Sequence, residues 1–205
     1  MLPEATLPSD VLDRLPAATP PPPWCCVARA VVWWQRGSGP VPDGSKALPL
    51  TAGAMVDYLD SPVGPYREVF AGTVLAHVGR PSLHVPFIAV DSTDSLQGGR
   101  ATWRLPKVLA SFSGSPIPTG ATGDGWSVRV SSRVVGPPVP VLGPFRAVQD
   151  GLSASITVHG TVRAALVRVA ATGPTLAGWL GEGSHAGFVA RGTVLLGVPT
   201  RTAHA

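Results

Sequence analysis

Glycine and proline interrupt this chain from end to end. Its 205 residues include 24 glycines and 23 prolines, scattered without the three-residue period of a collagen. Residues that end regular structure at such short intervals favour many short strands joined by turns. Since 44% of the residues are hydrophobic, the chain can bury a sizeable core, and its length suits one domain better than two.

Runs rich in β-branched and aromatic residues predict the strands. No repeat of fixed period connects them, so neither a solenoid nor a propeller is indicated. The pattern favours a mainly β (α+β) fold, an antiparallel closed or partly closed β-barrel with a few short peripheral helices. The strand candidates are 25–35, 69–78, 84–90, 126–135, 152–159, 161–169 and 188–198, with a hairpin turn over 79–82 and a loop over 37–49.

Short helices are expected at three places around this barrel. The first two begin at residues that can cap a helix, and glycine or proline soon ends them. The prolines at 20–23 form a stiff extended connector. We therefore expect two parts, an N-terminal helix and Pro-rich connector over 1–23 and a single domain over 24–205. The expected helices are 9–15, a segment from Ser92 or Thr93 to Gln97 that ends at Gly98 and Gly99, and 174–180.

Charge and hydropathy limit the partners of the chain. The net charge is +4 and the isoelectric point is near 9.7. The arginines are spread singly and no basic run interleaves with aromatics, so nucleic acid is not an expected partner. No run approaches about eighteen apolar residues, which speaks against a membrane span. Only 14% of the residues are charged and the mean hydropathy is +0.24, so the polar surface is thin and a homo-oligomer is expected.

The cysteines and the first residues of the chain indicate a reducing compartment. Cys25 and Cys26 are adjacent. Neighbouring residues of an extended chain point to opposite faces, so an ordinary disulfide is disfavoured. Reduced thiols in a cytoplasm are the simpler account. Residues 1–6 carry neither the basic nor the apolar region of an export signal. We therefore expect a cytoplasmic protein.

Lysine is scarce, and one lysine lies in an unusual setting. Among 16 basic residues, only Lys46 and Lys107 are lysines. Lys46 follows the polar segment 43–45, whereas Lys107 lies between the stretches 103–106 and 108–110, which are largely apolar. Position alone leaves two interpretations of Lys107. Either its stem packs while its ammonium reaches water, or the whole side chain is buried for a purpose.

A family resemblance includes this lysine. The segment 99–107, Gly-Arg-Ala-Thr-Trp-Arg-Leu-Pro-Lys, places a Gly-Arg pair before a Pro-Lys dipeptide. The segment 64–68, Gly-Pro-Tyr-Arg-Glu, adds a Tyr-x-Glu element whose Glu68 precedes Lys107 by 39 residues. Both resemble the acetoacetate decarboxylase family, in which this lysine forms a Schiff base and this glutamate has the same spacing. The resemblance covers about 29–109 and implies an acetoacetate decarboxylase-like fold.

The resemblance implies a carbon-carbon lyase that binds a small keto acid as an imine on Lys107. An ordinary lysine titrates near ~10.4, so an amine that attacks carbonyls at neutral pH needs a shift of about three units, roughly 4 kcal/mol, from burial or a neighbouring cation. Acetoacetate decarboxylase itself is the established example of such activation. The protonated imine of a 3-keto acid draws electrons from the bond to its carboxylate, so CO2 leaves and an enamine remains. The same intermediate can serve aldol addition or dehydration of a pyruvate-like acid.

Three further residues receive roles from the resemblance. Glu68 orients the substrate and moves protons, unless it is only a solvated carboxylate at a strand edge. Tyr66 lies on the same side of an extended segment and either donates a hydrogen bond to the substrate or only packs. Arg29 resembles the family arginine whose planar fork binds the substrate carboxylate, and Arg36 competes for that role.

The chain departs from the family at two positions. Val108 stands where family decarboxylases carry a second lysine, so the neighbouring cation is missing there, although Arg100 or Arg104 could approach in space. A second family acid aligns near Gly53, and Asp57 could substitute for it. These departures leave three functions open: a decarboxylating lyase, an aldolase-dehydratase, and a non-catalytic small-molecule binding module on the same fold.

Other chemistries lack support in the sequence. The five histidines do not form a metal-ligand spacing, so no metal is expected. Ser92, Ser95 and Ser111 have no nucleophile-elbow context. The glycine-rich segment 119–125 lacks the lysine and the spacing of a phosphate loop. We therefore expect a small keto acid as the ligand and no cofactor.

Overall fold

Seven strands form a closed ring in the computed structural model, which describes residues 2–42, 45–76 and 82–202. The order around the ring is β9-β10-β1-β2-β3-β4-β8, and the pairing of β8 with β9 closes it. All pairs in the ring are antiparallel except β4 with β8. The ring strands are β1 Trp24–Arg36, β2 Ala47–Asp60, β3 Tyr66–Leu75, β4 Ser82–Val90, β8 Trp126–Gln149, β9 Leu152–Thr172 and β10 Gly183–Leu196.

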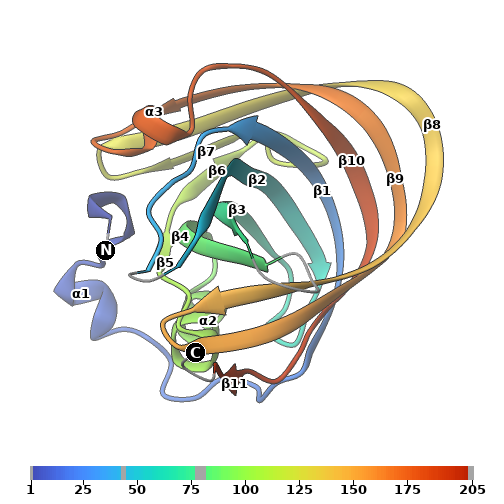
Figure 1. Ribbon diagram of the computed structural model, residues 1–205. Helices are drawn as coiled ribbons and strands as arrows, with labels where there is room; N and C mark the ends of the chain where they lie inside the picture. Colours follow the sequence, from blue (N-terminus) through green and yellow to red (C-terminus); the bar gives the residue numbers. More distant parts are fainter. Residues whose placement is uncertain (1, 43–44, 77–81, 203–205) are drawn as a thin grey trace.

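Short elements lie at the margins of this ring. Figure 1 shows the long strands β8, β9 and β10 curving around one side of the molecule, with the helices outside the sheet. The mainly β, ring-closed architecture with a few short helices confirms the predicted fold class. The marginal elements are η1 Pro3–Ala5, α1 Ser9–Leu12, α2 Thr93–Trp103, β5 Lys107–Leu109, β6 Ser111–Ser113, β7 Gly120–Gly123, α3 Leu176–Trp179 and β11 Thr200–Arg201.

Several strand predictions need correction. The run 69–78 largely coincides with β3 and the run 84–90 lies in β4, and the two strands pair antiparallel as expected. The end of the run 69–78 and residues 79–81 of the predicted turn 79–82 lie outside the described residues, and Ser82 begins β4. The runs 152–159 and 161–169 form one strand, β9. The strand β2 was not predicted at all, because the expected loop and the weak β-propensity of its alanines and glycine hid it.

Strand β8 continues well past the predicted end at residue 135, through a stretch that contains four prolines. Proline cannot donate to a ladder, so it belongs on a strand edge. In this stretch β8 pairs with β9 on one side only, because β7 pairs with it near its start and β4 near its end. Prolines at 137, 138, 140 and 144 are therefore compatible with a long edge strand.

Helix α2 also runs further than predicted. Ser92 caps it as expected, because the Ser92 side chain accepts a hydrogen bond from the Ser95 backbone N–H at 3.2 Å. The helix then passes through Gly98 and Gly99 rather than ending there. A Cβ at Gly98 would lie 2.4 Å from the Trp24 ring, and one at Gly99 would lie 2.5 Å from the Lys107 side chain. These glycines allow close packing of the helix, which ends instead at Trp103 with Arg104 as its C-cap.

The N-terminal segment packs into the same body as the ring. Leu2 and Ala5 are buried in the hydrophobic core. The Glu4 carboxylate accepts hydrogen bonds from the Thr175 backbone N–H and hydroxyl and from the Leu176 backbone N–H, at 2.6, 2.7 and 3.0 Å. Burial raises the pKa of Glu4, but these hydrogen bonds outweigh it and leave the pKa lowered. The predicted division of the chain at residue 23 stays a prediction.

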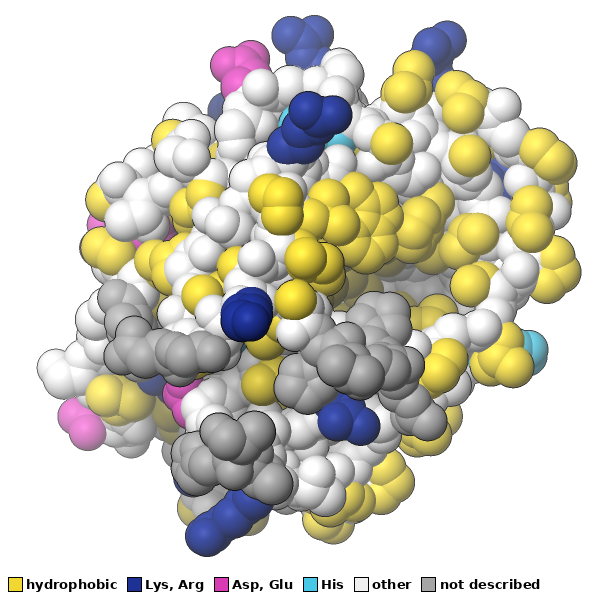
Figure 2. Space-filling model, in the orientation of Figure 1, with side chains coloured by type: hydrophobic (Ala, Val, Ile, Leu, Met, Phe, Trp, Pro, Cys, Tyr) yellow, Lys and Arg dark blue, Asp and Glu magenta, His cyan; other side chains and the backbone are white. Residues whose placement is uncertain are grey.

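Apolar side chains are numerous on the outside of the long strands. On β8, the exposed fractions of Val135, Val139 and Leu142 are 56%, 52% and 72%. Figure 2 shows hydrophobic side chains over much of one face, with few charged groups among them. Within the described residues, no helix combines the length and the hydropathy needed to cross a membrane.

Candidate active site

Lys107 is buried, not exposed. It begins β5, a three-residue strand that pairs parallel to β4 with Lys107 beside Ile88. Its side chain is only 4% exposed. The Lys107 Nζ donates hydrogen bonds to Glu68 Oε2 at 2.8 Å and to Ser95 Oγ at 2.9 Å. Of the two interpretations that the sequence left open, the structure supports complete burial.

The backbone around Lys107 fixes where this amine points. The Lys107 N–H donates to the Leu105 carbonyl across Pro106, which makes a tight turn at the start of β5. The Arg100 guanidinium, on α2, donates to the Lys107 carbonyl at 2.7 Å. The aliphatic stem of Lys107 then packs against Gly99, where any side chain would collide with it. The Gly-Arg and Pro-Lys pairs of the sequence motif therefore fix the position of the Lys107 backbone and side chain.

Glu68 lies in the middle of the sheet. Its strand β3 is flanked by β2 and β4, and the directly paired residues are Val56 and Val90. Its side chain is 5% exposed, so it is not a solvated edge residue. Besides Lys107, its carboxylate accepts a hydrogen bond from the Tyr58 hydroxyl at 3.3 Å. Two donors therefore hold the carboxylate in one orientation.

Two stacked tyrosines complete the surroundings of the amine. The rings of Tyr58 and Tyr66 lie 4.4 Å apart with an interplanar angle of 23°. Lys107 Nζ lies 5.2 Å from the centre of the Tyr66 ring. Burial raises the pKa of both tyrosines well above the ordinary value, and the negative charge of Glu68 adds to this rise. Both hydroxyls are therefore neutral at pH 7 and can donate hydrogen bonds.

The electrostatics of the pair follow from its burial. Burial of an ammonium or a carboxylate without an oppositely charged partner carries a large desolvation free energy. Each of these two groups therefore depends on the other to offset that cost. At 2.8 Å, one proton lies in the contact between Lys107 Nζ and Glu68 Oε2. Its transfer to the carboxylate would leave a neutral amine beside a neutral acid, with no net change in charge. The arrangement therefore places a carboxylate that can accept a proton beside a lysine amine, with both side chains almost fully buried.

Arg29 does not lie beside this pair. Neighbouring residues of a strand point to opposite faces of the sheet. Ala30 pairs with Val56, which pairs with Glu68, so these define the lysine face of β1–β3. Arg29 pairs with Asp57 on the other face, the arginine face, and its guanidinium contacts Asp57 Oδ2 at 2.7 Å. Its predicted contact with a substrate carboxylate at Lys107 is therefore not supported.

Arg36, the alternative to Arg29 as binder of the substrate carboxylate, also lies away from Lys107. Arg36 is the last residue of β1 and is exposed. It lies six residues beyond Ala30, which is about 20 Å along a strand. Asp57, the suggested substitute for the second family acid, is held by Arg29 on the arginine face. None of these three groups approaches the lysine.

The two departures from the family pattern also have structural reasons. A Cβ at Gly53 would lie 2.2 Å from the Trp33 indole, so this position cannot carry a carboxylate without moving that ring. Val108 is 4% exposed and packs in the core with Val31 and Trp33, on the opposite side of β5 from Lys107. A lysine at position 108 would place its charge in that apolar core.

The sequence motif and the structure agree in part on the site residues. The structure brings Lys107, Glu68 and Tyr66 together, while their roles stay predictions. Sequence reasoning missed Tyr58 and the hydrogen-bonding role of Ser95. The turn at Gly64 and Pro65 could have revealed Tyr58, because the hairpin pairs it with Tyr66. Across the described residues, no group of three or more His, Cys, Asp or Glu side chains is placed to hold a metal ion.

Solved structures of known proteins resemble the fold of this chain. No family model and no curated protein matches the sequence. Among solved structures, acetoacetate decarboxylase from Legionella pneumophila is 13% identical, with 93% of both chains covered and a TM-score of 0.59. An acetoacetate decarboxylase-like enzyme from Sphingomonas wittichii RW1 is 16% identical, with 89% of this chain and 93% of the other covered and a TM-score of 0.61.

A third solved structure extends the comparison. The enduracididine biosynthesis enzyme MppR, complexed with pyruvate, is 14% identical, with 90% of this chain and 92% of that chain covered and a TM-score of 0.61. Identities this low establish the fold alone. The chain therefore has the acetoacetate decarboxylase-like fold, as the sequence resemblance implied.

Proposed function

We propose that this protein is a Schiff-base-forming lyase that decarboxylates a small 3-keto acid through an imine on Lys107. The observation that carries the proposal is the buried contact of Lys107 Nζ with Glu68 Oε2 at 2.8 Å, with Ser95 as the second acceptor. A lysine kept from water beside a proton acceptor is what imine chemistry requires. A structural role alone would be an expensive use of two buried charges.

In the proposed reaction, Glu68 transfers protons while Lys107 forms the imine. Glu68 accepts a proton from the Lys107 ammonium, and the neutral amine attacks the ketone carbon. The Glu68 acid then protonates the carbinolamine hydroxyl, which leaves as water and gives the protonated imine. The bond to the carboxylate breaks, its electron pair enters the imine, and CO2 leaves with an enamine bound. Solvent supplies the proton that the enamine carbon takes up, and hydrolysis of the resulting imine releases the ketone and restores Lys107.

The fate of the substrate carboxylate favours decarboxylation over aldol addition or dehydration, although Val108 stands where family decarboxylases carry a second lysine. Among the described residues, the polar contacts of Lys107 Nζ are to Glu68 and Ser95, and Arg29 faces the other way. A substrate carboxylate beside these buried side chains would meet their hydroxyls, whereas the Arg100 guanidinium is bound to the Lys107 carbonyl. Loss of CO2 removes that poorly solvated charge. An aldolase-dehydratase that acts on a pyruvate-like acid retains the carboxylate and would need a lasting partner for it.

The test is turnover of a panel of 3-keto acids, followed as CO2 release above the uncatalysed rate. The proposal predicts enzyme-dependent release that Lys107→Arg and Glu68→Gln abolish. Carbon-carbon bond formation with pyruvate and an aldehyde, measured in parallel, would instead support the aldolase-dehydratase. Tight keto-acid binding without turnover, unchanged in Lys107→Arg, would support a non-catalytic binding module.

We also propose that the protein is a cytoplasmic homo-oligomer. The support is the exposed apolar surface of β8, where Leu142 is 72% exposed, together with the reduced cysteines. A surface of this kind is more often covered by another copy than left in water. Light scattering on the purified protein should give a mass above 21.1 kDa, and a monomeric mass at micromolar concentration would contradict the proposal.

A further inference from the structure

Charge is distributed unevenly over the fold. The four neighbouring strands β8, β9, β10 and β1 contain eight arginines and no Asp or Glu. The whole chain has a net charge of +4, so the rest of the chain carries −4. The sequence conceals this asymmetry, because the arginines lie singly along the chain and strand pairing brings them together. They are Arg29, Arg36, Arg129, Arg133, Arg146, Arg163, Arg168 and Arg191.

Three of these arginines form a group on one face of β8 and β9. Arg168 pairs directly with Ser131, and Arg129 and Arg133 lie two residues to either side of Ser131 on the same face. All three arginines are exposed. Within the part of the chain that the structure describes, none of the three guanidinium groups makes a hydrogen bond or an ion pair. Diagonal neighbours on a sheet face are about 7–8 Å apart, so the three charges repel one another and favour an anionic ligand.

Exposed apolar side chains adjoin this group on the same face. Arg133 pairs with Leu166, Leu166 pairs with Ala186, and Ala186 pairs with Trp34, so these four residues form one row across β8, β9, β10 and β1. Leu166 and Trp34 are 45% and 40% exposed. Three strand spacings separate the ends of the row, which is about 15 Å. We call the surface formed by Arg129, Arg133, Arg168, Leu166 and Trp34 the docking face.

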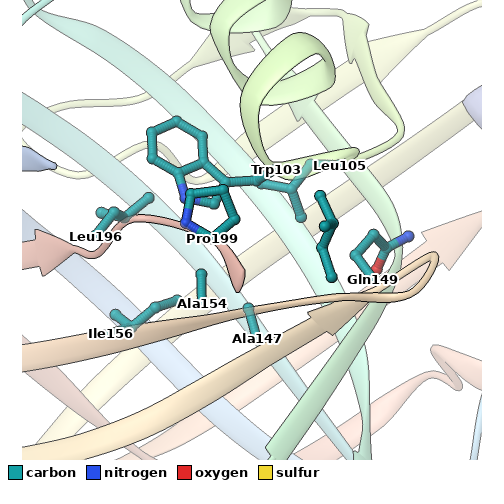
Figure 3. A pocket seen from close by; sticks show the side chains of 9 residues that line it. Trp103, Leu105, Ala147, Gln149, Ala154, Ile156, Leu196 and Pro199 are labelled. Carbon is teal, nitrogen blue, oxygen red and sulfur yellow. The ribbon is translucent and has the colours of Figure 1, made fainter. Parts of the chain in front are cut away.

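The same face of β9 is covered at its other end. Ile156 and Leu166 lie an even number of residues apart on one strand, so both side chains point to this face. Figure 3 shows Ala154 and Ile156 beside Trp103 at the end of α2, and Ala154 is only 5% exposed. Helix α2 therefore covers the face near residue 154, whereas the docking face stays exposed.

We propose that the docking face binds the surface of an anionic lipid bilayer. Its guanidinium groups contact lipid phosphates, while Trp34 and Leu166 enter the boundary between headgroups and acyl chains, where tryptophan is favoured. A second copy that met this chain through the same face would bring arginines together without a carboxylate between them. A nucleic acid would find no base-stacking surface on Leu166. The inference goes beyond the proposed reaction and does not depend on it.

The experiment compares vesicles of phosphatidylcholine with and without phosphatidylglycerol in a sedimentation assay. The protein should bind the anionic vesicles and leave them at about 1 M salt, which screens the charges. Arg133→Gln and Arg168→Gln should each lower the partition coefficient about fivefold, which corresponds to ~1 kcal/mol per basic residue. Arg191→Gln removes the same charge from an exposed position on the arginine face and should bind as the wild-type protein does.

A second set of measurements tests the apolar part and the other partners. Leu166→Ser should weaken vesicle binding about tenfold, which corresponds to ~1.4 kcal/mol, and leave the salt dependence in place. Absence of binding to the anionic vesicles, or an equal loss in Arg191→Gln, overturns the inference. A smaller mass of Arg168→Gln by light scattering, or a preference of the wild-type protein for an RNA oligonucleotide over vesicles, assigns the face to another partner and also overturns it.

Discussion

Two ion pairs of nearly equal length lie on opposite faces of the same sheet and differ in burial and in their neighbours. Lys107 and Glu68 meet at 2.8 Å with side chains 4% and 5% exposed. Arg29 and Asp57 meet at 2.7 Å with side chains 33% and 14% exposed. The first pair has a serine and two tyrosines around it, whereas the second faces Arg191 and Arg67 at paired strand positions.

The difference shows how strongly burial changes the energetics of an ion pair. A partly exposed pair is screened by water and typically adds 0 to about 1 kcal/mol. A fully buried pair has to overcome a desolvation cost of several kcal/mol per ion and is weak evidence for stability. The pair on the arginine face is therefore explained by cross-strand pairing alone. The pair on the lysine face is not explained by stability in this way, which agrees with the role proposed for it.

Removal of the buried lysine should have the largest effect. Lys107→Met leaves Glu68 as a buried charge without its partner, so the free energy of unfolding should fall by about 3–5 kcal/mol. The double variant Lys107→Met, Glu68→Leu should recover most of this loss, because an apolar pair of similar volume costs no desolvation. Urea unfolding measures both, and a loss below about 1 kcal/mol in the single variant would show that the pair is not buried in solution.

The reactivity of the two adjacent cysteines of β1 should show which face of the strand is buried and which is exposed. Cys26 is buried toward the lysine face and Cys25 is exposed. Burial, followed by the charge of Glu68, raises the pKa of the Cys26 thiol from 9.0 to about 12. A thiol reagent at pH 8 should therefore modify Cys25 alone in the native protein and both thiols after unfolding.

The same shift predicts a dependence of stability on pH. The folded state favours the neutral Cys26 thiol, so its contribution is fully present below the pKa of the unfolded thiol, near ~8.5, and is lost as the pH rises toward 12. Between pH 8 and 10, the wild-type protein should lose more stability than Cys26→Ala does. Equal reaction of both native thiols, or parallel pH curves, would place Cys26 outside the buried face.

Loss of the hydrogen bond to Glu68 should have an intermediate effect. Tyr58→Phe removes the hydroxyl that donates to Glu68 Oε1. A hydrogen bond to a charged group contributes about 1.5 kcal/mol, which corresponds to roughly tenfold in rate if the bond acts in the transition state. Keto-acid turnover should therefore fall about tenfold with a shifted pH profile, and an unchanged profile would leave Tyr58 as a packing residue only.

Changes on the arginine face should have the smallest effect. Arg29→Met should change the free energy of unfolding by no more than about 1 kcal/mol, since the pair it breaks is partly exposed. Turnover should stay within about twofold of the wild-type protein, because the guanidinium lies on the other side of the sheet. A large rise in KM for keto acids would instead return Arg29 to the role of carboxylate binder.

The sequence predicted what depends on local pattern and failed where distant packing decides. Runs of β-branched residues identified most strands, and the motif spacing identified Lys107 and Glu68. The face on which Arg29 lies could not be predicted, because an offset of one residue in a strand moves a side chain to the other face. The small residues of β2 have low β-propensity, yet Gly53 is needed there because the Trp33 ring lies over it.

The missed site residue on α2 has a similar explanation. Ser95 was considered only as a nucleophile, and no local pattern marks it as a hydrogen-bond acceptor for an amine. Its role depends on the packing of α2 against β5 at Gly99, which no sequence period encodes. Gly98 and Gly99 were taken as a helix end for the same reason, since helix propensity alone cannot reveal a ring or a lysine stem packed against the helix.

The central claim is that the buried amine of Lys107 forms a covalent imine. Incubation with a 3-keto acid and borohydride, followed by peptide mass spectrometry, tests it most directly. The account predicts one reduced adduct on Lys107, none on Lys46, and a much slower reaction in Glu68→Gln. An unmodified Lys107 across short and long keto acids, or equal labelling of both lysines, would contradict it.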